Sequence, residues 1–99
     1  MRIRMGTLAE LAPGKWLEKQ ILAKRVAVYN DGVQLFGIEA NCKHMRASLT
    51  AGKVEDGVVI CNWHGWRYDL KTGQCMTNTA FKLKTYTVEI RNGDVYLIL

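Results

Sequence analysis

The sequence predicts an all-β protein made of small antiparallel sheets. Short runs of residues that favour strands, such as 25–29 and 85–90, recur along the chain. Turn signals that contain Asp-Gly or Asn-Gly separate these runs, and such dipeptides tolerate the positive φ angles of hairpin turns. The chain of 99 residues contains no internal repeat. We therefore expect one domain, residues 1–99.

The N-terminal part is expected to contain an edge strand, a helical turn and three longer strands. Ile3 and Met5 alternate with arginines, which is typical of an edge strand. Thr7 and Glu10 have the spacing of a capping box at the start of a short helical turn. Strands are predicted for residues 16–22, 25–29 and 33–40, and a hairpin turn at residues 30–32 joins the last two.

The second half alternates short strands with tight turns. The predicted elements are a turn at 47–49, strands at 53–54 and 58–60 around a turn at 55–57, a turn at 69–73, a short strand at 74–77, and a terminal hairpin of 85–90 and 95–99 around a turn at 92–94. The strand 33–40 leads into Cys42, and the strand 58–60 leads into Cys61. We expect the loops that begin at these cysteines to start at neighbouring positions of one small sheet.

Two Cys-His pairs stand at the centre of the chain. Cys42 and His44 enclose one residue, Cys61 and His64 enclose two, and sixteen residues separate the pairs. The chain has two histidines and three cysteines, so both histidines and two of the cysteines belong to these pairs. We interpret Cys42, His44, Cys61 and His64 as the four ligands of one metal centre.

These ligands suit either a zinc ion or a mixed-ligand [2Fe-2S] cluster. Structural zinc sites usually pair cysteine with cysteine and histidine with histidine. Here each pair is mixed, and the single residue between Cys42 and His44 makes it awkward for both to bind one tetrahedral ion. Gly65, directly after His64, permits a tight loop with its backbone close to the metal. The spacing favours the cluster, and a structural zinc module that binds an acidic partner is the alternative.

The order Cys-x-His, sixteen residues, Cys-x-x-His-Gly resembles the Rieske iron–sulfur signature, and the likeness covers most of the chain. The resemblance implies that Cys42 and Cys61 hold one iron of a [2Fe-2S] cluster as thiolates, while His44 and His64 hold the other as imidazoles. It also implies the Rieske fold, in which small antiparallel sheets carry an inserted cluster-binding subdomain, here at about residues 40–81.

Residues 63–69 resemble the second cluster loop of Rieske ferredoxins and of the Rieske domains of aromatic-ring dioxygenases. Tyr68 stands where the family has a tyrosine next to the cluster, which can donate to a cysteine sulfur. Trp66 stands where high-potential Rieske proteins have a serine that donates to a cluster sulfide, and we expect Trp66 to pack under the loop. Trp63 is expected to shield the cluster or to present an apolar docking surface. Gly65 completes this predicted set of residues around the ligands.

The missing serine predicts a reduction potential at the low end of the Rieske range, which is about −150 to +300 mV, shifted up slightly if Tyr68 donates to a cysteine sulfur. Donors to sulfur stabilise the reduced, more negative cluster, so the loss of one donor lowers the potential. The family covers its cluster with a proline-containing segment, but the one proline here is Pro13. We expect residues 77–83 to cover the cluster less rigidly, or through Phe81. Cys75 is expected to be a buried residue near the cluster.

The net charge of the chain is +5, and Lys43, Arg46 and Arg67 fall inside the cluster loops. A basic collar around exposed histidines would steer an electron-transfer partner with an acidic docking surface. Because the basic residues form no dense run, nucleic acid is not an expected partner. No apolar run approaches the ~20 residues of a membrane-spanning helix. We therefore expect a cytoplasmic protein without a membrane partner.

The resemblance to ferredoxin components of multicomponent dioxygenases implies a soluble one-electron carrier. It would take electrons from a flavin-dependent reductase and pass them to a terminal oxygenase or similar acceptor. Oxygen activation in Rieske oxygenases needs a second iron held by two more histidines and a carboxylate, so this chain is not expected to be an enzyme by itself. The alternative is a Rieske subunit or regulatory component of a larger oxidoreductase, such as an oxygenase or a nitrite reductase.

Overall fold

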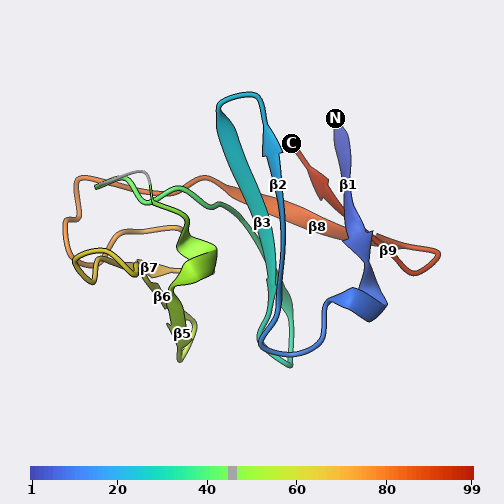
Figure 1. The fold of residues 1–99 in the computed structure, drawn as a ribbon, viewed down its shortest axis with the longest axis horizontal. Coiled ribbons are helices and arrows are strands. Elements are labelled where there is room, and N and C mark those ends of the chain that lie inside the picture. Colours follow the sequence, from blue (N-terminus) through green and yellow to red (C-terminus); the bar gives the residue numbers. More distant parts are fainter. Residues whose placement is uncertain (45–46) are drawn as a thin grey trace.

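The computed structural model describes residues 1–44 and 47–99 and has the all-β fold that the sequence predicts. Over these residues the strands form two antiparallel sheets, of six strands in the order β1-β9-β8-β4-β3-β2 and of three strands in the order β5-β6-β7. Figure 1 shows the smaller sheet at one side of the larger one. The larger sheet contains β1 (Arg2–Thr7), β2 (Trp16–Ile21), β3 (Lys24–Asn30), β4 (Leu35–Glu39), β8 (Thr85–Arg91) and β9 (Asp94–Ile98), and the smaller contains β5 (Lys53–Glu55), β6 (Val58–Ile60) and β7 (Arg67–Asp69).

The helical turn predicted near the N-terminus is confirmed as the 3-10 helix η1 (Leu8–Glu10). The Thr7 hydroxyl accepts a hydrogen bond from the Glu10 N–H at 3.3 Å, and the Glu10 carboxylate accepts one from the Thr7 N–H at 2.8 Å. These reciprocal bonds form the predicted capping box and satisfy two donors that the helix start would otherwise leave free.

The smaller sheet is an insertion between two neighbouring strands of the larger one. β4 and β8 pair with each other, with Gly37 opposite Tyr86 and Ile38 opposite Thr85. The chain therefore leaves the larger sheet after β4, builds β5 to β7, and returns beside the strand that it left. A side chain at Gly37 would clash with Leu97, since an added Cβ would lie 2.5 Å from its Cδ2 atom.

The buried side chains divide into two clusters. One belongs to the larger sheet and contains Met5, Leu11, Val26, Val28, Val95 and Leu97. The other joins the smaller sheet to β3 and β4 and contains Tyr29, Phe36, Ile38, Cys42, Leu49, Val59, Cys61, Tyr68, Leu70, Cys75 and Leu83. All three cysteines are therefore in the second cluster, and the expected burial of Cys75 is confirmed.

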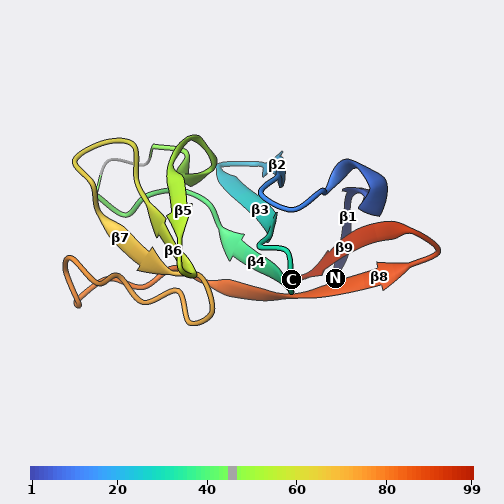
Figure 2. The ribbon, with the colours of Figure 1, turned by 90° about the horizontal axis from the view of Figure 1, so that it is seen from below.

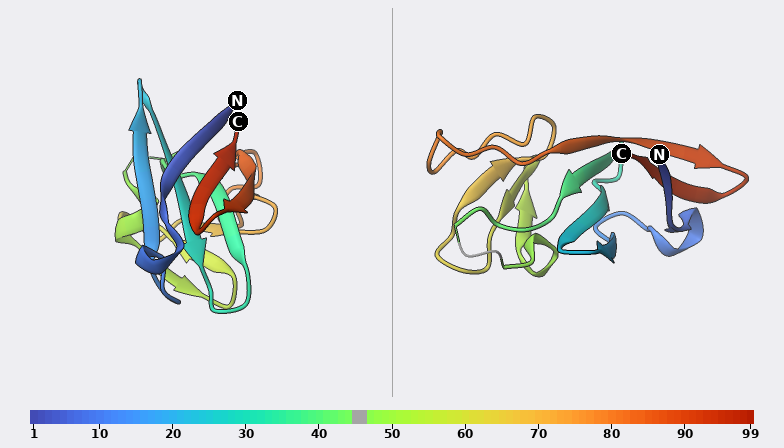
Figure 3. Two further views of the ribbon diagram at one scale, coloured as in Figure 1. Left: turned by 90° about the vertical axis from the view of Figure 1, so that its right-hand side faces the viewer. Right: turned by 90° about the horizontal axis from the view of Figure 1, so that it is seen from above.

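The expectation that both cysteine loops start from one sheet is wrong. The first loop follows β4 of the larger sheet, whereas the second loop joins β6 to β7 of the smaller sheet. Figure 2 and the right-hand view of Figure 3 show these loops at one end of the molecule and the β8–β9 hairpin at the other. Because the first loop starts from another sheet, the packing between the sheets decides how the two loops meet.

Three boundaries differ from the sequence prediction. Residues 67–69 form β7, although the sequence assigns them to the second loop. Residues 74–77 form no strand, because the Cys75 N–H donates to the Phe81 carbonyl and the chain makes only isolated bridges there. The turn between β3 and β4 spans residues 31–34 and is longer than predicted, because the Asp31 carboxylate accepts from the N–H groups of residues 33 and 34.

Within the described residues, no helix has the length and apolar character needed to cross a membrane.

Candidate metal centre

The first loop is a closed turn that buries its cysteine and exposes its histidine. An isolated bridge between Asn41 and Ser48 closes its base, and the Cys42 N–H donates to the Ala47 carbonyl at 2.8 Å. Cys42 has no exposed surface, while His44 is exposed. Arg46 of the predicted basic collar, together with residue 45, lies outside the described residues.

The second loop likewise buries its cysteine and exposes its histidine. The Cys61 N–H donates to the Trp66 carbonyl at 2.7 Å and closes the loop. His64 and Gly65 follow each other with φ angles of 63° and 69°, so the chain reverses within two residues. This is the tight turn that a glycine after the histidine makes possible, because a left-handed φ costs glycine little. Cys61 is buried and His64 is exposed.

The two loops bring like side chains together. The imidazole rings of His44 and His64 lie with their centroids 5.0 Å apart at an interplanar angle of 55°. Burial raises the pKa of the Cys61 thiol, and the adjacent Cys42 side chain raises it further. The Trp63 N–H points at the Cys61 sulfur from 3.4 Å. The site therefore has a sulfur pair in the interior and a nitrogen pair at the surface.

Tyr68 connects β7 to the first loop. Its hydroxyl accepts a hydrogen bond from the Lys43 N–H at 2.9 Å and lies 3.3 Å from the Cys42 sulfur. The side chain is fully buried, and this burial raises the pKa of the phenol. A phenol is protonated at neutral pH even at its ordinary pKa, so the Tyr68 hydroxyl has a hydrogen that it can donate to the sulfur.

The donor set fits a binuclear cluster with two kinds of ligand. Thiolates and imidazoles are the ligands of Rieske clusters, two of each on separate irons. Among residues 1–44 and 47–99, no three His, Cys, Asp or Glu side chains are placed to hold a single metal ion. The four predicted ligands come instead as the buried pair Cys42 and Cys61 and the exposed pair His44 and His64.

The tryptophans of the second loop differ in their surroundings. Trp66 packs against the core cluster that contains the cysteines, and its indole also stacks on the His44 ring at 4.6 Å between centroids and 12° between planes. Trp63 is 56% exposed, with its ring edge toward His64 at 6.2 Å. This exposure beside a histidine favours the docking role for Trp63 over the shielding role.

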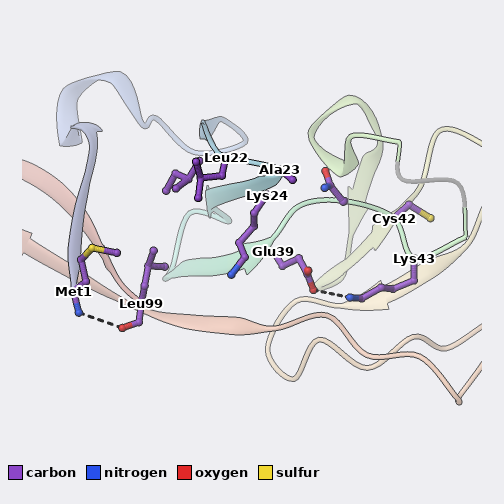
Figure 4. Close-up of a pocket in the computed structure, with 10 residues that line it drawn as sticks. Met1, Leu22, Ala23, Lys24, Glu39, Cys42, Lys43 and Leu99 are labelled. Carbon is purple, nitrogen blue, oxygen red and sulfur yellow. Dashed lines mark hydrogen bonds and ion pairs between the residues drawn. The ribbon is translucent and has the colours of Figure 1, made fainter.

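The basic residues of the predicted collar differ in whether an acidic side chain lies close enough to offset their positive charge. The Lys43 ammonium lies 3.0 Å from the Glu39 carboxylate, and Figure 4 shows Lys43 reaching back from the first loop to β4. Arg67 is exposed and forms no ion pair within the described part of the chain. Sequence reasoning missed Glu39, because a separation of four residues indicates a side-chain pair on a helix and not between the end of a strand and a loop.

A cavity of about 700 Å³ lies beside the first loop, on the same side as Glu39 and Lys43 (Figure 4). Its lining combines apolar residues of the β2–β3 turn with both chain ends. The full lining is Met1, Ile21, Leu22, Ala23, Lys24, Glu39, Asn41, Cys42, Lys43 and Leu99. Neither histidine lines it, so this cavity is separate from the surface at which the imidazoles meet.

Comparisons with known proteins agree with this geometry. Residues 2–87 match the family described as the Rieske [2Fe-2S] domain. Ferredoxin CarAc of Metapseudomonas resinovorans is 33% identical over 97 residues, which is 96% of this chain and 91% of that protein. The ferredoxin component of biphenyl 2,3-dioxygenase of Rhodococcus jostii (strain RHA1) is 31% identical over 91 residues, which is 91% of this chain and 85% of that protein.

A solved structure gives the same result for the fold. A chain of the complex of reduced oxygenase and oxidized ferredoxin in carbazole 1,9a-dioxygenase has a TM-score of 0.87 to this chain at 28% identity. The match covers 97% of this chain and 91% of that chain.

Proposed function

This chain belongs to the Rieske [2Fe-2S] family, and from this we propose that it is a soluble ferredoxin that carries electrons from a flavin-dependent reductase to a terminal oxygenase or similar acceptor. Its cofactor is a [2Fe-2S] cluster, and its role is electron transfer. The observation that carries the proposal is the arrangement of the two loops, which places a buried thiol pair beneath an exposed imidazole pair.

In this proposal Cys42 and Cys61 would hold one iron as thiolates, and His44 and His64 would hold the other as imidazoles. When bound, the cluster supplies one-electron chemistry at a raised potential. The charges of two ferric ions, two sulfides and two thiolates cancel, and neutral imidazoles add none. One electron therefore gives a charge of −1, which is easier to accommodate than the charge of a reduced four-cysteine cluster. The low end of the Rieske range of potentials stays our prediction.

The protein's own residues would do three things around this centre. Tyr68 would donate to the Cys42 sulfur and tie β7 to the first loop. Gly65 would let the second loop turn back directly after His64. The exposed Trp63 and Arg67 would form a docking surface, apolar at its centre and basic beside it, for an acidic partner. Lys43 belongs to the proposed surface with its charge offset by Glu39, and the sequence prediction adds Arg46, which lies outside the described residues.

The relatives support the proposed partner. They are ferredoxins, one of them a component of a dioxygenase, and one similar chain comes from a complex of an oxygenase with a ferredoxin. We also propose a cytoplasmic location, one domain over residues 1–99, and a cluster-binding subdomain at about residues 40–81. The insertion of β5 to β7 between β4 and β8 supports that subdomain.

Spectroscopy with metal analysis of the purified protein tests the proposal. A Rieske ferredoxin is red-brown, contains equal amounts of iron and inorganic sulfide, and gives a rhombic electron paramagnetic resonance signal on reduction. A zinc module would be colourless and silent, and fresh protein without inorganic sulfide would overturn the proposal. Copurification with a larger catalytic chain would favour the alternative of a subunit or regulatory component of a larger oxidoreductase.

A further inference from the structure

Residues 74–81 form an ordered loop although they contain no proline. The Gln74 side-chain amide lies within hydrogen-bond distance of three carbonyl oxygens, those of Cys75 at 3.2 Å, Thr79 at 3.1 Å and Phe81 at 3.0 Å. The Cys75 N–H also donates to the Phe81 carbonyl at 3.1 Å, and the Phe81 N–H donates to the Asn78 carbonyl at 3.1 Å. The loop thus folds back on itself around one side chain, and this fixes the backbone at Phe81.

Hydrogen bonds also connect this loop to β7, the strand that follows the second loop. The Met76 N–H donates to the Arg67 carbonyl at 2.7 Å, and the Arg67 N–H donates to the Thr77 hydroxyl at 3.0 Å. Arg67 is adjacent in sequence to Trp66. The backbone bonds therefore set the position of Phe81 relative to the Trp66 indole.

Three aromatic rings connect this loop to the first loop. The rings of Phe81 and Trp66 lie 5.7 Å apart between centroids at 47°, and the Trp66 indole stacks on His44 at 4.6 Å and 12°. Both distances are within the range of favourable aromatic pairs. The indole is half-buried and also packs against the core cluster that contains the cysteines. One face of the His44 imidazole is therefore covered by the Trp66 indole, and Phe81 and the core cluster pack against that indole in turn.

His64 has no comparable cover within the described residues. Its ring meets Trp63 edge-on at 6.2 Å and 70°, and Trp63 is more than half exposed. The two imidazoles differ, since only His44 has a parallel aromatic ring against its face. Trp66 and Trp63 thus form a natural matched pair, in which one tryptophan stacks on a histidine and the other does not.

We propose that Trp66, supported by Phe81, is a positioning residue that fixes the plane of the His44 imidazole and excludes water from the ring face that it covers. This inference rests on the proposed function, because it assigns His44 as a cluster ligand. In this proposal Trp66 and the loop of residues 74–81 have the covering role that a proline-containing segment has in the family.

The expected effect on the potential has a definite sign. The oxidised centre is neutral and the reduced centre carries a negative charge. Water stabilises the charged state more than an apolar indole does. A cover over His44 therefore lowers the reduction potential, and its removal raises it.

Trp66→Leu and Trp63→Leu test the inference in the cluster-loaded protein. Three properties are measured: the potential by redox titration, the paramagnetic resonance line shape after reduction, and the rate of cluster loss to a chelator. Trp66→Leu is expected to raise the potential, change the line shape, and lose its cluster about tenfold faster, since residues behind metal ligands change metal affinity by this order. Trp63→Leu is expected to shift these properties less than Trp66→Leu does, because Trp63 meets His64 only edge-on and is more than half exposed.

Phe81→Leu is a second variant that tests the inference if Trp66→Leu assembles no cluster. The Phe81 substitution loosens the packing of the Trp66 indole without removing a side chain that contacts His44. It is expected to shift the same properties in the same direction by smaller amounts. Two results would overturn this inference and leave the proposed function intact. One is wild-type values of the three properties in both Trp66→Leu and Phe81→Leu. The other is equal shifts in Trp63→Leu and Trp66→Leu. A wild-type protein without iron and sulfide would instead overturn the proposed function before any variant is compared.

Discussion

The Tyr68 hydroxyl lies 3.3 Å from the Cys42 sulfur, and both side chains are fully buried. The same hydroxyl accepts a hydrogen bond from the Lys43 N–H at 2.9 Å. One lone pair of the hydroxyl oxygen is thus occupied by the backbone, and in the contact with the sulfur either the hydroxyl or the Cys42 thiol can be the donor. Because a metal-bound thiolate has no hydrogen, Tyr68 must be the donor in the cluster-loaded protein.

Tyr68→Phe is expected to lower the reduction potential, because a donor to sulfur stabilises the reduced cluster more than the oxidised one. If the difference between the two states is about 1 kcal/mol, a fraction of a hydrogen bond to a charged group, the shift is on the order of 40 mV for one electron. A redox titration measures it. Tyr96→Phe, in β9 of the other sheet, is the control, and equal potentials in wild type and Tyr68→Phe would refute the donor role.

His64→Cys is expected to move the potential sharply downward, toward the value of about −400 mV that is typical of four-cysteine clusters. The reason is electrostatic, since a thiolate adds a negative charge where a neutral imidazole adds none. Titration and the change in the paramagnetic resonance spectrum measure the effect. Cys75→Ala is the control, because Cys75 is buried but is not a predicted ligand. An unchanged potential in His64→Cys would contradict the ligand assignment.

The sequence predicts the all-β class, the two Cys-His pairs and most of the strands. The proposed ligands are recognisable because each histidine of the chain follows a cysteine within three residues. The capping box of Thr7 and Glu10 is recognisable for a similar reason, since its partners are only three residues apart. Features that depend on short spacing can be read from the chain alone.

The surroundings of the ligands depend on contacts between distant segments and could not be predicted in this way. The stack of Trp66 on His44 requires a loop of the larger sheet to meet a loop of the smaller one. The predicted strand at residues 74–77 fails for a related reason, because the Gln74 side chain lies within hydrogen-bond distance of the Cys75 carbonyl, which a strand would offer to a neighbour. Strand propensity does not account for a side chain that hydrogen-bonds to the backbone in place of a neighbouring strand.

Arg67→Glu is expected to slow electron transfer with an acidic partner at low salt, and raising the salt concentration should reduce the difference between variant and wild type. Arg67 is exposed in the second-loop region and unpaired within the described residues, so its charge acts on the approaching partner. Stopped-flow transfer rates at several ionic strengths measure the effect. Arg91→Glu makes the same charge change at the end of β8 and serves as the control. Equal slowing in both variants would show that only the net charge matters.

Glu39→Gln is expected to speed the same transfer at low salt. The Glu39 carboxylate holds the Lys43 ammonium at 3.0 Å, so its neutralisation leaves the lysine charge free to attract an acidic partner. The substitution keeps an oxygen that can accept from the Lys84 N–H, which now donates to Glu39 at 3.1 Å. Glu55→Gln is the control with the same charge change in β5. A rate in Glu39→Gln no higher than in this control would remove Lys43 from the docking surface.

Gly73→Ala is expected to destabilise the fold much more than Gly57→Ala, although the two glycines have nearly the same backbone conformation. Their φ angles are +80° and +77°, and a left-handed φ costs a non-glycine residue about 1–2 kcal/mol. An added Cβ at Gly57 meets nothing within 4 Å, whereas at Gly73 it would lie 2.2 Å from the Leu83 carbonyl oxygen.

That carbonyl oxygen belongs to the backbone segment that follows Phe81, so the clash must displace the loop that supports Trp66. Such overpacking costs a further 1–3 kcal/mol or so, and the loss in unfolding free energy should be about 2–5 kcal/mol for Gly73→Ala against about 1–2 kcal/mol for Gly57→Ala. Denaturant unfolding at equal cluster content measures both. Equal losses would mean that the chain at residues 73–83 shifts freely, and a loop that shifts freely could not hold Phe81 against the indole.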